Sequence, residues 1–469
     1  MAKQSASETK LKWWQLSLLG VAFTIGTGFF LGSHLAIEIG GPAILAAYLL
    51  AAITAYLVFD QLARMTAKEP LEGSFRSYAK KAFGRWAGFS SGWVYWSSET
   101  LIVGSQLSAL ALFSRFWFPQ VPMWCFAIGF GALGLLIIVL GTKGFERMEN
   151  LFAVMKASAI VLFIILAALA LFGVFKTAAH GPKVPREWLP AGWTGLWAGF
   201  IFAFYAYGGL EVMGLMATRL QDPRQAPKAG RVMLFLLGSV YILSLGLSLI
   251  LEPWESFHAR RSPFVMALSD YGLAFVPHLF NGVLIIAGFS TMTASLFAVT
   301  TILITLAKDR DAPPLFSKMS GTKKKPWAAI GLTTAGLSGS VLFALWLPGR
   351  VYEYMTTAAG LMLIYNWLFI LVTSGRLLER TTWTRTKRYI GIGLVMLAIT
   401  GTWFHAKSRP GFYISLGFVV VIALVTFLVS SYRKRSQEQR TVRFPSKVKA
   451  ESDQRQAGYD RNSGKQPAR

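Results

Sequence analysis

The chain has 469 residues, of which 54% are hydrophobic and 15% charged, and its mean hydropathy is +0.47. Apolar stretches of bilayer-crossing length recur along it, which predicts an all-α integral membrane protein and excludes soluble domains with separate cores. The single cysteine, Cys125, excludes an intramolecular disulfide, and the five histidines are not spaced as a metal cluster. We therefore expect no metal site and no cofactor.

The net charge of +25 comes from 47 Lys and Arg residues that cluster between the apolar stretches. In a soluble chain this charge would suggest nucleic acid as a partner, but such placement is typical of segments beside lipid head groups. We expect contact with the lipid bilayer and no nucleic-acid binding. The clusters recur in alternate loops, which predicts that both termini face the cytoplasm of a protein in the cell membrane.

Apolar runs of about 20 residues, broken at charged, Gly or Pro clusters, predict twelve transmembrane helices. They form one polytopic domain, 14–433, between a cytoplasmic tail, 1–13, and a basic tail, 434–469, that we expect to be disordered. In chain order the predicted helices are 16–36, 42–63, 87–117, 122–141, 151–174, 193–218, 231–251, 275–307, 327–347, 351–375, 388–405 and 411–432.

The first predicted helix is interrupted near mid-membrane by the sequence Ile25-Gly26-Thr27-Gly28. Glycine removes the steric barrier to unwinding, and unwound backbone at this depth is tolerated only where protein or a water-filled cavity receives its polar groups. The half-helix that follows would present the N–H groups of Gly26, Thr27 and Gly28 at its positive end, where a carboxylate binds.

The sixth predicted helix has a similar interruption, in Phe204-Tyr205-Ala206-Tyr207-Gly208-Gly209-Leu210-Glu211. Carbonyl groups freed near Phe204, Tyr205 and Gly208 would accept hydrogen bonds from an ammonium group. Tyr205 and Tyr207 form either an aromatic lid over a ligand or ordinary packing. Glu211 is either a carboxylate that links the break to a gate or an acceptor that caps freed N–H groups.

The two interruptions fall in the first helix of each of two possible five-helix halves. Paired glycine-interrupted helices are the best sequence pointer to the binding site of a transporter, whereas single glycines often serve close helix packing. A carboxylate site opposite an ammonium site would bind a zwitterion. The sequence therefore predicts an amino acid as the ligand.

Lys156 is a single charge inside an apolar run, from Asn150 to Leu166, that otherwise predicts a membrane-crossing helix. A charge at this depth is costly, and intramembrane ionisable residues generally mark functional sites.

Further motifs follow one another in a specific order. They are Gly26 to Gly32, Gly73-Ser74-Phe75, Gly88-Phe89, Gly92 to Trp96, Glu149 with Lys156, Gly209-Leu210-Glu211, Asp222-Pro223, Pro227-Lys228-Ala229, Ser262-Pro263-Phe264, Asn281, Ala307-Lys308-Asp309 and Ala312-Pro313. Because these motifs occur in this order, the chain from about residue 14 to 432 resembles the bacterial amino acid transporter branch of the amino acid, polyamine and organocation (APC) superfamily.

The resemblance implies a LeuT-like inverted repeat of five plus five helices, two additional helices, broken helices 1 and 6, and alternating access without ATP. It also implies that Lys156 takes the place of the cation that related sodium-coupled carriers hold between helices 1, 5 and 8. Ser290 and Thr291 would match the hydroxyls of that site. A lysine facing the Gly26–Gly28 break can take up and release a proton, which implies proton symport. The alternative is a permanently charged strut bonded to helix 1 carbonyls.

One departure from the family pattern bears on the substrate. Many members carry a carboxylate in helix 3 where this chain has Gln106, and Glu99, to which we assign no role, lies earlier in the same helix. The missing acid favours a neutral, apolar amino acid over a cationic one.

The sequence thus predicts a secondary active transporter, not an enzyme, that imports an amino acid with a proton. Two alternatives stay open: an amino acid exchanger without proton coupling, and a membrane sensor that binds an amino acid and signals through its basic tail. We predict no particular oligomeric state.

Overall fold

The computed structural model describes residues 10–175, 185, 187–257, 261–320, 325–346, 351–379, 381–406 and 408–443. The ends of both predicted tails, 1–9 and 444–469, lie outside these residues. Over the described part of the chain the structure is helical, and its β-structure is limited to two isolated bridges, Leu11 with Leu220 and Ser320 with Lys325. The chain divides into a unit of residues 1–418, which contains the site described below, and a unit of residues 419–469.

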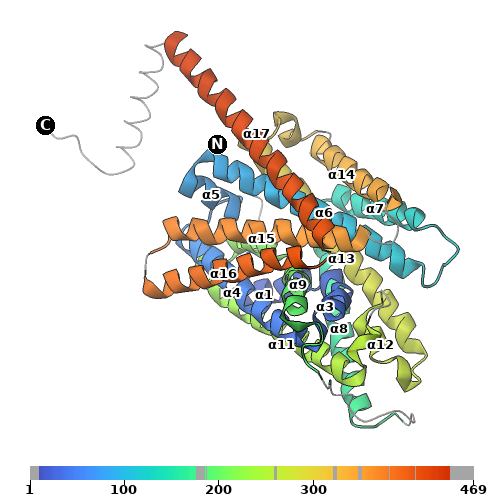
Figure 1. Ribbon diagram of the computed structural model, residues 1–469. Coiled ribbons are helices and arrows are strands. Elements are labelled where there is room, and N and C mark those ends of the chain that lie inside the picture. Colours follow the sequence, from blue (N-terminus) through green and yellow to red (C-terminus); the bar gives the residue numbers. More distant parts are fainter. Residues whose placement is uncertain are drawn as a thin grey trace. The chain divides into compact units, whose positions relative to one another are not determined.

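The helices follow one another along the chain (Figure 1). Within the described residues, six short 3-10 turns lie between them. In chain order the α-helices are α1 (Trp13–Thr24), α2 (Thr27–Phe30), α3 (Gly32–Gly40), α4 (Ile44–Lys68), α5 (Phe75–Phe83), α6 (Arg85–Ser114), α7 (Met123–Leu140), α8 (Thr142–Leu171), α9 (Gly192–Tyr205), α10 (Leu210–Met216), α11 (Ala226–Leu251), α12 (Pro263–Met266), α13 (Phe275–Lys308), α14 (Trp327–Trp346), α15 (Val351–Leu377), α16 (Thr382–Phe404) and α17 (Arg409–Arg443).

Eight segments of the described chain are long and apolar enough to cross a membrane. One of them, Thr27–Lys68, joins the end of the first predicted helix to the second. The remaining predicted spans fall on α6, α14 and α16, which are too polar or too short for the same criterion. The all-helical membrane class is therefore confirmed, whereas the count of twelve crossings and the inverted repeat stay predictions.

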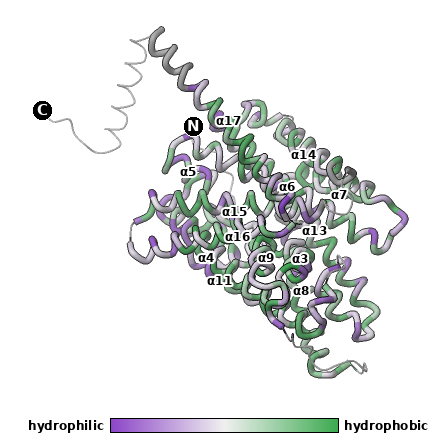
Figure 2. The backbone as a smooth tube through the Cα atoms, in the orientation of Figure 1, coloured by the Kyte–Doolittle hydropathy of each residue, from purple (hydrophilic) through white to green (hydrophobic). Residues whose placement is uncertain are grey.

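Hydrophobic residues run along most helices, and hydrophilic residues gather at helix ends and loops (Figure 2). Large apolar side chains on the outer helices are exposed, for example Leu133 and Leu136 on α7 and Val161 and Ile165 on α8. Because lipid is as apolar as these side chains, such a surface is typical of helices that face the bilayer.

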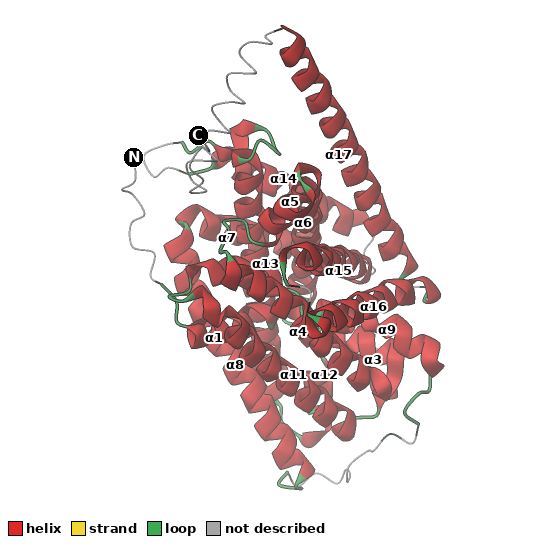
Figure 3. Ribbon diagram, turned by 90° about the vertical axis from the view of Figure 1, so that its left-hand side faces the viewer, coloured by secondary structure: helices red, strands yellow, loops and turns green. Residues whose placement is uncertain are grey.

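The helix α6 packs most extensively against α13 and α15, which lie beside it in Figure 3. An apolar cluster joins α6 to α13 and α14, and Leu107, Leu110, Met292, Leu296 and Leu337 are among its members. This packing fixes one face of α6 against α13, so that the polar residues Glu99 and Gln106 of α6 face the interrupted helices.

Candidate functional site

The first interruption separates α1 from α2. Ile25 and Gly26 are extended, and the helix resumes at Thr27. A Cβ atom on Gly26 would collide with the Thr291 hydroxyl of α13, so only glycine allows this close approach. The N–H groups of Gly26, Thr27 and Gly28 form no backbone hydrogen bond within the described residues, as expected at a helix start.

The second interruption, between α9 and α10, is a turn in which Gly209 has φ +105°. Its N–H donates to the Glu211 carboxylate over 3.2 Å, and the indole N–H of Trp367 on α15 donates to the other carboxylate oxygen. Glu211 is fully buried. It thus caps an N–H freed by the break, as one of its two predicted roles requires, and a role in gating stays a prediction.

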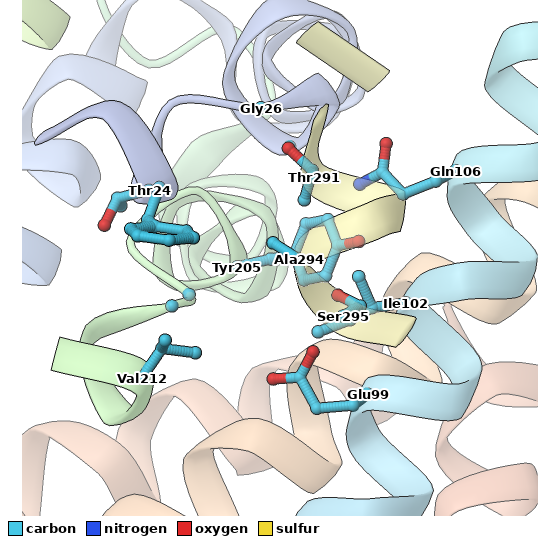
Figure 4. Close-up of a pocket in the computed structure, with 14 residues that line it drawn as sticks. Thr24, Gly26, Glu99, Ile102, Gln106, Tyr205, Val212, Thr291, Ala294 and Ser295 are labelled. Atoms are coloured by element: carbon cyan, nitrogen blue, oxygen red, sulfur yellow. The ribbon is translucent and has the colours of Figure 1, made fainter. Parts of the chain in front are cut away.

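A cavity lies between the two interruptions and α6 and α13 (Figure 4). Of the predicted site residues, Gly26, Gly28, Gln106, Tyr205, Gly208 and Thr291 line it; Phe23, Thr24, Glu99, Ile102, Gly209, Val212, Ala294 and Ser295 complete the lining. The structure therefore brings the two glycine breaks together around one space.

Four other predicted site residues lie behind the cavity wall. The Thr27 hydroxyl donates to the Gln106 amide oxygen, and the Tyr207 hydroxyl donates to the Tyr48 carbonyl over 3.2 Å. Phe204 packs beside Trp367, with ring centroids 6.0 Å apart, and Ile25 is buried. Tyr207 therefore packs between helices, whereas Tyr205 reaches the cavity and its hydroxyl lies 2.9 Å from that of Ser105.

Lys156 lies on α8, and its side chain is buried between α1 and α13. The ammonium donates to the Ala22 carbonyl over 2.5 Å and to the Ser290 hydroxyl over 2.8 Å. It also forms an ion pair with Glu149 at 3.5 Å, and the Ser290 hydroxyl lies 2.8 and 2.9 Å from the two Glu149 oxygens. The charge that is costly in an apolar helix is thus compensated by a buried carboxylate and two oxygen acceptors.

Ser290 belongs to this charge cluster, whereas its neighbour Thr291 faces the cavity. The cluster and the cavity meet at the first interruption, because Ala22 lies in the last turn of α1 and Thr291 touches Gly26. A change of charge at Lys156 would therefore act directly on the backbone that forms the break.

Several residues of the site had no role assigned from the sequence, among them Glu149, Thr24 and Glu99. Glu149 lies seven residues before Lys156, a spacing that places both on one helix face. Thr24 ends α1, and its hydroxyl is buried without a hydrogen-bond partner among the described residues. Glu99 lines the cavity. Helix periodicity could have linked Glu149 to Lys156. The rotation of α6 that turns Glu99 toward the cavity depends on how α6 packs against its neighbours, which the sequence pattern does not give.

A second group of charges lies where α5 meets the end of α13. The buried Arg76 guanidinium binds Asp311 at 2.7 Å and Asp309 at 2.9 Å. Lys80 binds Asp309 at 2.9 Å, and Arg85 binds Asp311 at 2.8 Å. Burial raises the pKa of the Asp309 carboxyl, but Lys80 and Arg76 outweigh this effect and hold the pKa below its ordinary value. This network ties the connection before α6 to the end of α13.

Together these features define a multi-pass helical membrane protein with a cavity between two interrupted helices, the arrangement found in secondary transporters. The chain matches the family model described as amino acid permease over residues 15–439. It therefore belongs to the amino acid permease family, whose members in the comparison are named as transporters and permeases.

Individual relatives agree with this assignment. The chain is 52% identical to the uncharacterized transporter YcgH of Bacillus subtilis (strain 168), over 92% of this chain and 97% of the relative. It is 30% identical to the aromatic amino acid transport protein AroP of Corynebacterium glutamicum, over 89% and 95% of the two chains. The identity with AroP of Escherichia coli (strain K12) is 32%, over 76% and 78%. The protein is an amino acid transporter of the membrane, not an enzyme.

Proposed function

We propose that this protein imports a neutral amino acid together with a proton across the cell membrane by alternating access. The bundle would have twelve crossings, arranged as two inverted five-helix repeats with two additional helices, and both termini in the cytoplasm. The observation that carries the proposal is the buried cluster of Lys156, Glu149 and Ser290 against the first helix break.

The α-carboxylate of the substrate would bind at the start of α2. The N–H groups of Gly26, Thr27 and Gly28 are available there, and the positive end of a helix favours an anion. Gln106 supports this assignment, because its amide oxygen is engaged by Thr27 while its amide nitrogen faces the cavity (Figure 4). An amide donor at this position would hold the carboxylate without adding charge.

The α-ammonium would bind on the opposite side of the breaks. The Thr24 hydroxyl is buried and unpartnered, and Gly208 lines the same cavity. The Phe204 carbonyl accepts the N–H groups of Ala206 and Tyr207, whereas the Tyr205 carbonyl accepts that of Gly208 and has a second lone pair for another donor. These acceptors, rather than an acidic side chain, would receive the ammonium.

Proton coupling would operate through the pair of Lys156 and Glu149. A proton arriving at this buried pair changes its net charge, and an uncompensated charge at this depth is costly. Because Lys156 donates to the Ala22 carbonyl in the last turn of α1, its charge state would act on the position of the break. Substrate binding and proton binding would thus depend on each other.

Two observations support a neutral side chain. Gln106 stands where a carboxylate would attract a cationic group, and the relatives from C. glutamicum and E. coli are named for aromatic amino acids. The cavity wall also offers Phe23, Ile102 and Val212 as apolar contacts.

Uptake into proteoliposomes under an imposed inward proton gradient tests the proposal. The native protein should accumulate amino acid when the outside is acidic, and Lys156→Ala should abolish the response to the gradient. Lys318→Ala is the matched control, because Lys318 is exposed and its side chain forms no hydrogen bond or ion pair within the described residues. An equal response of Lys156→Ala and the native protein would remove Lys156 from the coupling mechanism.

The bond from Lys156 to the Ala22 carbonyl also fits a second function, exchange of one amino acid for another, with Lys156 as a permanent strut. An exchanger would need substrate on both sides of the membrane and would show no net accumulation in empty vesicles.

A further inference from the structure

Glu99 is a buried carboxylate with no part in the proposed proton coupling or in the proposed binding of the substrate backbone. It projects from the middle of α6 into the cavity, and only 3% of the residue is exposed. Its polar neighbours are the hydroxyl of Ser295 on α13 (Figure 4) and that of Tyr95, one turn earlier on α6. Within the described residues Glu99 forms no ion pair.

A buried carboxylate is costly unless hydrogen-bond donors satisfy it, and it offers about four acceptor positions. Nearby Glu211 shows how this region meets that requirement with neutral donors, namely the Gly209 N–H and the Trp367 indole N–H. In the part of the chain that the structure describes, Glu99 has no comparable N–H donor. It therefore keeps acceptor capacity that faces the cavity.

The separation of Glu99 from Gln106 along α6 gives an approximate distance between the two ends of the cavity. The two residues are seven positions apart on one face of α6, which corresponds to about 10 Å along the helix. Gln106 lies at the end of the cavity near Gly26 and Thr291, and Glu99 lies at the other end beside Ser295 (Figure 4). Ile102 and Ala294 line the wall between them, so the middle of the cavity offers apolar contact.

We propose that Glu99 is a specificity-determining residue that accepts a hydrogen bond from a donor at the tip of a long, neutral substrate side chain. A phenol or an indole has this form, because an apolar ring carries one O–H or N–H at its far edge. The inference rests on the proposed function for the place of the α-carboxylate, and it adds the side-chain end of the site.

Tyrosine and phenylalanine form the decisive pair of competitors, because they differ only in the O–H group. A site built to hydrogen-bond a substrate hydroxyl rejects the analogue that lacks it, since its own polar group is then left unpaired. Against a labelled substrate chosen from a panel of the twenty amino acids, the native protein should favour tyrosine over phenylalanine by about tenfold or more.

Two variants test whether Glu99 causes this preference. Glu99→Leu should bring the tyrosine to phenylalanine ratio close to one, and Glu99→Gln, which keeps an acceptor oxygen and is the safer variant for folding, should retain part of it. Glu187→Gln is the control, because Glu187 is exposed. Binding to purified protein in detergent gives the same ratio without transport.

The inference is wrong if Glu99→Leu and Glu99→Gln both leave the ratio unchanged, or if no amino acid with a donor-tipped side chain competes. It is also wrong if lysine or arginine competes best and loses that advantage in Glu99→Leu, because the subsite would then be a cation site. None of these results affects the proton-gradient test, so failure of the subsite and failure of the proposed transport are distinguishable.

Discussion

The Lys156 ammonium lies 2.5 Å from the Ala22 carbonyl oxygen, in the last turn before the first helix break. Two residues 134 positions apart are thus joined where the first helix is interrupted. The same ammonium reaches Ser290 on α13 and Glu149 on its own helix. A single side chain therefore links three helices around the site.

Removal of the Glu149 carboxylate, the ion-pair partner of Lys156, should destabilise the protein. Glu149→Gln leaves the Lys156 charge buried without its counter-charge, and breaking a buried pair in this way costs about 3–5 kcal/mol. The unfolding temperature in detergent should fall accordingly. A double variant, Glu149→Leu with Lys156→Met, should recover most of this stability but not proton-driven uptake. If Glu149→Gln unfolds like the native protein, the ion pair is not part of the folded state.

The close contact of Gly26 with Thr291 predicts a steric effect with a rescue. Gly26→Ala should strongly reduce amino acid uptake, because the added methyl group collides with the Thr291 hydroxyl. Adding Thr291→Ala should restore part of the activity. Gly246→Ala, in the helix α11 with open space around it, is the control and should be nearly neutral. Equal loss in Gly26→Ala with and without Thr291→Ala would rule out this collision as the cause.

The indole N–H of Trp367 should contribute to both thermal stability and amino acid uptake. Trp367→Phe keeps the ring packing but leaves one oxygen of buried Glu211 without a donor, which costs about 1–3 kcal/mol. We expect lower thermal stability and reduced uptake. Trp193→Phe serves as the comparison, since Trp193 is 75% exposed. Identical behaviour of the two variants would show that the bond to Glu211 contributes nothing measurable.

The two helix interruptions could be predicted from the sequence, because clustered glycines in a membrane-crossing helix favour a break in that helix. The predicted meeting of Lys156 with helix 1 and Ser290 likewise appears in the structure. Glu99 could not be placed, since a residue's direction within an apolar helix depends on how that helix rotates against its neighbours. The network of Arg76 with Asp309 and Asp311 joins a loop to a helix end, and sequence periodicity carries no information about such contacts.

The Arg76 network predicts a dependence of stability on pH. The pKa of Asp309 is lowered in the folded state, so its contribution is present above the ordinary aspartate value of about 3.9 and is lost as pH falls through the folded value. Unfolding temperature should therefore drop between about pH 5 and pH 3, roughly one unit either side of that ordinary pKa. Asp309→Asn should show a smaller drop over the same range. A drop of the same size in both proteins would assign the effect to other groups.

In the proposed mechanism a neutral amino acid and a proton cross the membrane together. Electrical recording on proteoliposomes at equal pH on both sides tests it most directly, because a zwitterion carries no net charge and the proton carries one. Addition of substrate should produce an inward positive current in the native protein and in Lys318→Ala, and no current in Lys156→Ala. Uptake of labelled substrate by the native protein without any current or proton movement would rule out proton symport.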